Sequence, residues 1–282
     1  MSVPSPFHRI GVAGLGLIGG SVAMAARERF PDVIVRGCDE APRFDAARAR
    51  GAISDGGSDV RALADCDLIV VAVPLAAMRE VLMAIAESGT SALVTDVGST
   101  KRHVMNIARG AHGLRFIGGH PMAGRERPGL DQADADLFVD RPWLLVQGTA
   151  DAESDARLES FVRALGARAR WMEAAAHDRA VAFVSHLPQI LGAALMAAAD
   201  AGIGEDGVGV AGPAFGEMTR LASSPPEMWH TVLAENADFV AEALAGLSAE
   251  LPTVADLQSG TWVRDVLTRA GSARGRWQRK DG

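Results

Sequence analysis

The chain has 282 residues, a length that fits two domains better than one. Its hydrophobic content of 48% and charged content of 22% are ordinary for a protein with a packed core. A net charge of −7, without any basic stripe, argues against a general nucleic-acid binder.

Signal peptides and membrane spans also have recognisable sequence patterns. The first ten residues lack a charged region followed by an apolar one, so we expect no signal peptide. No apolar run approaches the ~20 residues of a membrane span, so we expect no membrane partner. Cys38 and Cys66 lie in strand-like segments and are interpreted as small buried thiols of a reducing compartment. The sequence therefore predicts a cytoplasmic protein.

The first part of the chain, from Arg9 to about Met172, alternates apolar β-rich runs with helical periodicity. Strands are expected at 10–13, 33–38, 68–73, 93–97, 116–118 and 143–146. Helices are expected at 21–29, 76–86 and 155–165. Several strands are apolar at every residue, which is typical of parallel strands covered on both faces. This alternation predicts a doubly wound, Rossmann-type parallel sheet in an α/β fold.

The pattern changes near Ala174, beyond which only Ala- and Leu-rich helical stretches follow. These are expected at 177–199, 215–222, 226–247 and 254–267, with a polar, basic tail at 271–282 that we expect to fray. We therefore divide the chain into a dinucleotide-binding domain, 1–173, and an all-helical domain, 174–282. The Ala-rich faces suit close helix packing and predict a homodimer through the helical domain.

A dinucleotide-binding fingerprint follows the first expected strand, with glycines at Gly14, Gly16 and Gly19. The first glycine permits a tight turn, the second lets a pyrophosphate approach the backbone, and the third lets helix and strand pack closely. The following helix, expected to begin near Gly19, offers free N–H groups to the phosphates. The expected cofactor-binding residues are completed by Leu17, Ile18, Val73 and Pro74.

The acid that selects the cofactor is Asp39, twenty positions past Gly19 at the end of the second strand. Its carboxylate is placed to accept hydrogen bonds from the adenine ribose and to repel a 2′-phosphate, and Glu40 adds to that repulsion. Arg36 and Arg43 are nearby cations that would weaken it. The pattern favours NAD over NADP.

Two loops after later strands carry the candidate reactive groups. Ser99, in Asp96–Lys101, is either a helix N-cap or a reactive-site hydroxyl. His120 lies in the small-residue loop Gly118–Gly124 and is either structural or an acid/base. Both loops are expected at the carboxyl ends of parallel strands, where α/β proteins bind ligands. We expect no metal site.

Five ordered motifs resemble the prephenate/arogenate dehydrogenases, enzymes of tyrosine biosynthesis. The motifs are Gly14–Ser21, Asp96–Lys101, Gly118–Gly124, Ser185–Pro188 and Met228–Trp229. The resemblance extends from about residue 10 to about residue 257. It implies a nucleotide-binding domain followed by a helical dimerisation domain.

The resemblance also implies an NAD-dependent oxidoreductase that decarboxylates a cyclohexadienol. Hydride leaves ring C4 for the nicotinamide, the ring carboxylate departs as CO2, and the ring becomes aromatic. By position, His120 resembles the residue that takes the 4-hydroxyl proton, and Ser99 resembles the partner that orients it. Arg220 resembles the clamp for a carboxylate of the small dicarboxylate substrate, a role that a guanidinium fork suits.

Several further positions of the helical region are open to more than one interpretation. His186 and Gln189 lie three apart on one helix face and are expected to line the substrate pocket. Many family members carry a second histidine where this chain has Gln189, which leaves open how the substrate side chain is recognised. His177 is interpreted as a helix-end or packing residue, and Lys101 as either a phosphate-side cation or an exposed one.

The leading hypothesis is a prephenate dehydrogenase. Arogenate and 4-amino-4-deoxyprephenate are alternative substrates, because they share the ring and differ in a single substituent. A non-catalytic NAD-sensing module on the same fold is the alternative of a different class. A sensor has no need for Ser99, His120 and Arg220, so the presence of all three favours the enzyme.

Overall fold

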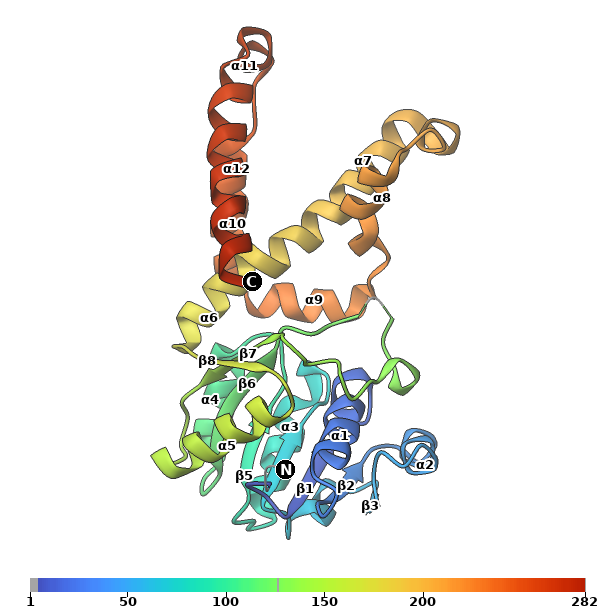
Figure 1. Cartoon of the computed structure of the whole chain (residues 1–282), viewed down its shortest axis with the longest axis vertical. Coiled ribbons are helices and arrows are strands. Elements are labelled where there is room, and N and C mark those ends of the chain that lie inside the picture. Colours follow the sequence, from blue (N-terminus) through green and yellow to red (C-terminus); the bar gives the residue numbers. More distant parts are fainter. Residues whose placement is uncertain (1–4, 126, 282) are drawn as a thin grey trace. The chain divides into compact units, whose positions relative to one another are not determined.

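The computed structural model describes residues 5–125 and 127–281. Within these ranges the strands form one sheet in the order β3-β2-β1-β4-β5-β6-β7-β8 (Figure 1). The strands are β1 (Arg9–Ala13), β2 (Ile34–Cys38), β3 (Asp55–Gly57), β4 (Leu68–Val71), β5 (Leu93–Asp96), β6 (Arg115–Pro121), β7 (Pro142–Val146) and β8 (Arg168–Trp171). The β6–β7 pair is antiparallel and the other pairs are parallel. The chain order reverses direction between β1 and β4, and ligands of doubly wound folds bind at such a point.

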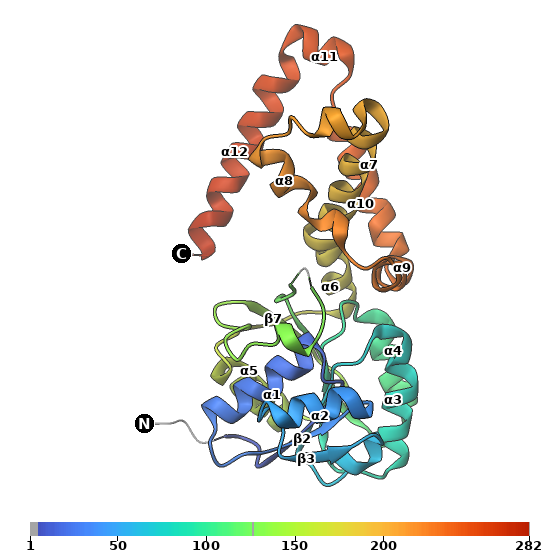
Figure 2. The ribbon, with the colours of Figure 1, turned by 90° about the vertical axis from the view of Figure 1, so that its right-hand side faces the viewer.

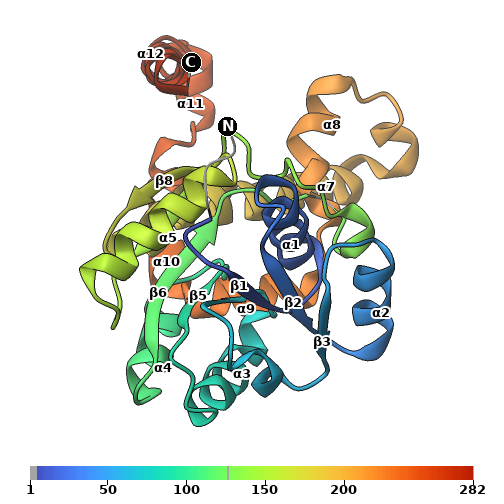
Figure 3. The ribbon, with the colours of Figure 1, turned by 60° about the horizontal axis from the view of Figure 1, so that its bottom comes forward.

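Helices cover both faces of this sheet. They are α1 (Leu17–Arg29), α2 (Ala41–Ala49), α3 (Leu75–Glu87), α4 (Arg102–Gly110) and α5 (Ala152–Ala164). Figure 3 shows α1 and α5 on one face and α3 and α4 on the other. Figure 2 shows α3 and α4 side by side. The doubly wound α/β fold expected from the sequence is confirmed.

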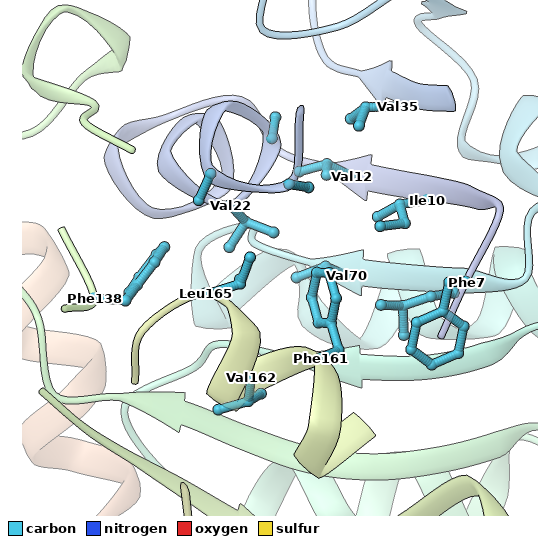
Figure 4. Packing of buried hydrophobic residues seen from close by; sticks show 14 of the residues in the cluster. Phe7, Ile10, Val12, Val22, Val35, Val70, Phe138, Phe161, Val162 and Leu165 are labelled. Atoms are coloured by element: carbon cyan, nitrogen blue, oxygen red, sulfur yellow. The ribbon is translucent and has the colours of Figure 1, made fainter. Parts of the chain in front are cut away.

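The core is split by the sheet into two layers. Along β4, Leu68 and Val70 point into one hydrophobic cluster, while Ile69 and Val71 point into the other. Alternate side chains of a strand face opposite sides, so a strand buried on both faces is apolar throughout. Figure 4 shows the first cluster, in which the labelled residues are Phe7, Ile10, Val12, Val22, Val35, Val70, Phe138, Phe161, Val162 and Leu165.

The rest of the chain is helical. After β8 come α6 (Ala174–Val181), a π-helical turn (Ala182–His186), α7 (Leu187–Val208), α8 (Pro213–Thr219), the short 3₁₀ turn η4 (Arg220–Ser223) and α9 (Pro226–Glu235). They are followed by α10 (Ala237–Glu250), α11 (Val254–Ser259) and α12 (Thr261–Asp281). Packing groups residues up to 237 into one compact unit and those from 238 onward into a second. In the first unit, α9 crosses the carboxyl end of the sheet and contacts α3 (Figure 1).

Some elements differ from the sequence-based expectation. The edge strands β3 and β8 were not expected, because glycines and arginines are poor strand formers that edges tolerate. Helix α2 was not expected either, and α4 was expected only in the interpretation of Ser99 as a helix N-cap. The stretch expected as one helix at 226–247 is two helices that break at Asn236, and the tail expected to fray is helical to Asp281.

One helical stretch of the chain is both long and apolar. Among the described residues, the helical stretch Ala174–Val208, which is kinked at Gly204, is long and apolar enough, by length and composition, to cross a membrane, contrary to our expectation from the sequence. Packed helices of soluble proteins pass the same test, so this is weak evidence for a membrane span. The two cysteines are free and buried, as expected.

Candidate active site

The glycine-rich turn has the geometry that its sequence predicts. Gly14 has a φ of 94°, and a Cβ there would lie 2.5 Å from the carbonyl oxygen of Ala72. A Cβ on Gly19 would lie 1.9 Å from the Gly14 oxygen, whereas one on Gly16 would meet nothing within 4 Å. The turn is therefore tight beside Gly14 and Gly19 and open at Gly16. Helix α1 begins at Leu17, two residues earlier than expected, without a side-chain cap, so its N–H groups suit a pyrophosphate.

The side chain of Asp39 is hydrogen-bonded to this turn. Its carboxylate accepts hydrogen bonds from the backbone N–H groups of Leu15 and Glu40, both at 2.7 Å. It also pairs with Arg43, with Nε at 3.0 Å, and only 10% of its side chain is exposed. Arg36, in contrast, pairs with Asp65 at 2.5 Å. Of the two cations expected near Asp39, the structure places Arg43 against its carboxylate.

The remaining expected cofactor residues lie around the same turn. Val73 and Pro74 connect β4 to α3, and a Cβ on Gly14 would lie 3.0 Å from the Val73 nitrogen. Ile18 packs its side chain against the hydrophobic core. The glycine turn, Asp39 and this connection meet where the strand order reverses, as a dinucleotide site requires.

His120 is the first member of a buried polar chain. It lies within β6 and not in a loop as expected, and it is 8% exposed. Its Nδ1 lies 2.9 Å from Nε2 of His177, and Nδ1 of His177 lies 2.8 Å from Oδ1 of Asp178. His177 and Asp178 belong to α6 and are fully buried. The three side chains form a continuous relay that ends at a carboxylate.

The positions of the protons follow from Asp178. Burial alone would raise the pKa of its carboxyl, but hydrogen bonds from His177 and from the backbone N–H groups of Arg102 and Lys101 lower it overall. The carboxylate only accepts, so His177 donates from Nδ1 and accepts at Nε2. His120 then donates from Nδ1, and its Nε2, which has no hydrogen-bond partner among the described residues, is left as a free acceptor. A neutral imidazole with a free Nε2 is the form that a general base requires.

The neighbours of His120 keep it neutral. Burial lowers its pKa well below the ordinary value of 6.5, and the nearby His177, Lys101 and His186 lower it further. Burial lowers the pKa of His177 as well, against the opposing hydrogen bond to Asp178. At neutral pH, His120 is therefore ready to accept a proton.

A buried ion pair fixes the backbone beside His120. Lys101 and Asp96 are completely buried and paired with each other, so neither of the two roles expected for Lys101 holds. The other oxygen of Asp96 accepts the N–H of Gly119 at 3.0 Å. This bond connects the end of β5 to β6 directly before His120. The pair therefore holds the two loops expected to share the site in one rigid arrangement.

Ser99 is half-buried on the same loop and has no hydrogen bond to residues 5–125 or 127–281. Helix α4 begins only at Arg102, and Asp178 caps it by accepting the N–H groups of Lys101 at 2.7 Å and Arg102 at 2.9 Å. Ser99 is therefore not a helix cap. The partner of His120 in the structure is His177, so a substrate-facing role for Ser99 stays a prediction.

His186 ends the π-helical turn that precedes α7. Pro188 lacks an N–H and would clash with the carbonyl of Val184, which accounts for the widened turn. Nδ2 of the buried Asn236 donates to the carbonyl of Asp178 at 2.7 Å and lies 3.2 Å from Nδ1 of His186. Burial lowers the pKa of His186 to about 4. A neutral His186 that accepts at Nδ1 presents an Nε2–H donor.

The expected carboxylate clamp, Arg220, opens the η4 turn and is exposed. It lines a cavity of about 550 Å³ together with Gly124, Arg125, Arg127 and Gln132. Gly124 is four residues past His120. Arg125 is paired with Asp134 at 2.6 Å, and the net positive charge of the three guanidinium groups still favours an anionic ligand, as a dicarboxylate would be. No described group of three or more His, Cys, Asp or Glu side chains could hold a metal ion.

Sequence reasoning missed three members of this site: His177, Asp178 and Asn236. Adjacent His and Asp residues at the start of a helix were the available signal for the first two. The functional role of this pair depends on the contact between His177 and His120, which are 57 residues apart in the chain. Periodicity and motif spacing do not reveal such a contact.

Two family models match the chain. Residues 22–170 match the prephenate dehydrogenase nucleotide-binding domain, and residues 173–262 match the prephenate dehydrogenase dimerization domain. Prephenate dehydrogenase of Lactococcus lactis subsp. cremoris is 31% identical over 254 residues, which cover 88% of this chain and 70% of that protein. Cyclohexadienyl dehydrogenase of Zymomonas mobilis subsp. mobilis is 29% identical over 282 residues, which cover 95% of each chain.

Solved structures are similar along nearly the whole chain. Arogenate dehydrogenase of Synechocystis has a TM-score of 0.80 at 29% identity, over 95% of this chain and 99% of the other. Prephenate dehydrogenase of Aquifex aeolicus, in complex with hydroxyphenyl propionate and NAD+, has a TM-score of 0.85 at 24% identity, over 99% of each chain. The second likeness supports the fold.

Proposed function

Because the chain belongs to the prephenate dehydrogenase family, we propose that it catalyses the NAD-dependent oxidative decarboxylation of prephenate to 4-hydroxyphenylpyruvate. The observation that carries the proposal is the free Nε2 acceptor of His120, held by His177 and Asp178 in a dinucleotide-binding fold. Such an acceptor is what the oxidation of a ring hydroxyl requires.

In this reaction NAD, when bound, supplies the acceptor for the hydride. As hydride leaves C4, Nε2 of His120 takes the proton of the 4-hydroxyl, so the hydroxyl oxygen gains carbonyl character. The C1–carboxylate bond then breaks, CO2 leaves, and the electron pair of that bond enters the ring, which becomes an aromatic phenolate. The phenolate oxygen takes the proton back from Nε2 of His120, which gives 4-hydroxyphenylpyruvate and restores the neutral imidazole. The Asp178 carboxylate at the end of the relay stabilises the imidazolium that forms on His120. The chain itself thus orients the substrate and holds one proton between the two steps.

The two carboxylates of prephenate have different fates in the reaction, and this difference indicates which of them Arg220 binds. The ring carboxylate loses its charge as CO2, so a strong cation on it would stabilise the ground state more than the transition state. The side-chain carboxylate keeps its charge throughout. We therefore assign Arg220, on the arginine-lined cavity, to the side-chain carboxylate.

The choice of substrate is tested by assay. Purified protein is incubated with NAD and, separately, prephenate, arogenate or 4-amino-4-deoxyprephenate, and NADH absorbance is followed. Turnover of prephenate at the highest kcat/KM supports the proposal, and a preference for arogenate favours the alternative named in the Synechocystis relative. Absence of turnover with all three would favour an NAD-sensing module.

For assembly, we propose a homodimer through the helical domain in a cytoplasmic protein. The matched dimerization-domain model supports the dimer. Helix α7 exposes Leu191, Leu195 and Ile203, the last to 61%, and an apolar helix face of this kind suits a second copy of the chain. The same contact would account for the apolar stretch without a membrane.

Replacing Arg220 with alanine is expected to raise KM for prephenate about ten- to 100-fold while KM for NAD stays nearly unchanged. A hydrogen bond to a charged group is worth about 1.5–3 kcal/mol, and the lost contact is to the substrate alone. Steady-state kinetics with each substrate varied in turn makes the measurement. Equal losses for both ligands would contradict the assignment.

Cofactor choice is expected to depend on Asp39. The double variant Asp39→Asn, Glu40→Gln keeps an acceptor for the Leu15 N–H, removes both charges, and frees Arg43 for a 2′-phosphate. We expect the ratio of kcat/KM with NADP to that with NAD to rise about tenfold or more.

The matched control is Glu87→Gln, which removes a surface carboxylate paired with Arg61 and should leave the ratio unchanged. A wild-type enzyme that already prefers NADP would show that this interpretation of Asp39 is wrong.

A further inference from the structure

Gln189 has both ends of its amide engaged by one short segment of the chain. It lies near the start of α7 and is 7% exposed. Its Nε2 donates to the carbonyl of Leu221 at 2.8 Å, and the Ser224 hydroxyl donates to its Oε1 at 3.2 Å. Leu221 follows Arg220 in η4, and Ser224 is the C-terminal cap of that turn. One buried amide therefore fastens the turn that carries Arg220 to α7.

A second contact on the same face of α7 supports this attachment. Gly192 is one helical turn beyond Gln189, so both face the same neighbour. A Cβ on Gly192 would lie 3.0 Å from the carbonyl oxygen of Met218 and 3.5 Å from Cβ of Leu221. The helix thus approaches the backbone on both sides of Arg220.

The η4 turn needs these contacts with α7 because its internal hydrogen bonds hold it only weakly. A four-residue 3₁₀ turn has few and poorly aligned internal hydrogen bonds. Arg220 is exposed on the cavity wall and has a long side chain with many rotamers. Its guanidinium can form a two-pronged bond to a carboxylate only if its backbone is held in place.

We propose that Gln189 is a positioning residue: it fixes η4 on α7 so that Arg220 meets the substrate carboxylate, and it does not itself bind the substrate. This replaces the pocket-lining role expected from the sequence. It rests on the proposed function, since it needs Arg220 to anchor the substrate.

The test is a double-mutant cycle between Gln189→Met and Arg220→Ala. Gln189→Met keeps the size of the side chain and removes both hydrogen bonds. Alone, it is expected to raise KM for prephenate about fivefold or more, with kcat within about twofold and KM for NAD unchanged. In the Arg220→Ala background it is expected to change kcat/KM by less than about twofold, because its effect passes through Arg220.

Two further variants complete the design. Ser224→Ala removes one of the two bonds from a half-buried position and is expected to raise KM for prephenate about twofold to threefold. It keeps the test valid if Gln189→Met does not fold. Gln147→Met is the matched control, because among residues 5–125 and 127–281 that amide hydrogen-bonds Asp155 alone, on the surface at 3.1 Å, and it should leave all constants unchanged.

Three results would overturn the proposal: an unchanged KM in Gln189→Met and Ser224→Ala, losses that multiply in the double variant, or a parallel loss of NAD affinity. Multiplying losses would mean that Gln189 contacts the substrate itself. Failure of the proposed function gives a different pattern, since Arg220→Ala alone would then leave KM for prephenate unchanged.

Discussion

The variant His120→Asn is expected to keep its fold and its affinity for NAD but to lose about 10²- to 10⁴-fold in kcat, the usual contribution of a positioned base. Asparagine can still contact Nε2 of His177 by an amide group, but it has no basic nitrogen to accept the 4-hydroxyl proton. Single-turnover and steady-state kinetics measure the loss, and NAD titration checks the cofactor site. The matched control is His112→Asn, at an exposed position, which should behave as wild type.

The pH profile tests the same residue independently. The neutral imidazole is the active form, so activity is lost as pH falls through the pKa of His120. Burial, His177, Lys101 and His186 all lower that pKa, so the acidic limb of kcat/KM should lie below pH 6.5, not near it. His120→Asn should lack this ionisation. Near-normal turnover with the same acidic limb would remove His120 from the mechanism.

The parts of the site that could be predicted from sequence are those fixed by local geometry. A glycine is required at Gly14 because the turn has a positive φ, and Asp39 is fixed by its place at the end of β2. That Asp96–Lys101 and Gly118–Gly124 share a site follows from the pairing of neighbouring parallel strands. The bond from Gly119 to Asp96 confirms that these two loops meet.

The parts that could not be predicted depend on contacts between distant segments. His177 was interpreted as a helix-end or packing residue, because nothing in its own segment indicates that β6 will place His120 against it. Gln189 was assigned to the pocket by its helical spacing from His186, whereas the structure turns its amide toward η4. Which partner a buried polar side chain bonds is decided by tertiary packing, and helical periodicity gives only the face.

Asp178→Asn is expected to lower kcat nearly as much as loss of His120 itself, by about 10²- to 10⁴-fold, although Asp178 does not touch His120. Four donors converge on this carboxylate: the backbone N–H groups of Lys101 and Arg102, Nε of Arg102, and Nδ1 of His177. An asparagine amide has one acceptor end and one donor end. It therefore cannot accept hydrogen bonds from both His177 and Arg102.

Each orientation of the new amide fails for a definite reason. If its NH2 group faces His177, Nδ1 of His177 must accept and Nε2 must carry the proton, so His120 is forced to accept at Nδ1. The proton of His120 then sits on Nε2, and no acceptor remains for the 4-hydroxyl. If the oxygen faces His177 instead, the NH2 group opposes two donors of Arg102.

The second orientation also weakens the cap of α4, at a cost of about 1 kcal/mol, so the melting temperature should fall modestly as well. A double variant separates this structural effect from the catalytic one. If Asp178 acts on the chemistry through the tautomer of His120, then adding Asp178→Asn to His120→Asn should lower kcat by less than about twofold. Losses that multiply would show that Asp178 contributes to catalysis by another route. His177→Asn breaks the relay without touching the cap, so a normal kcat in that variant would refute the relay.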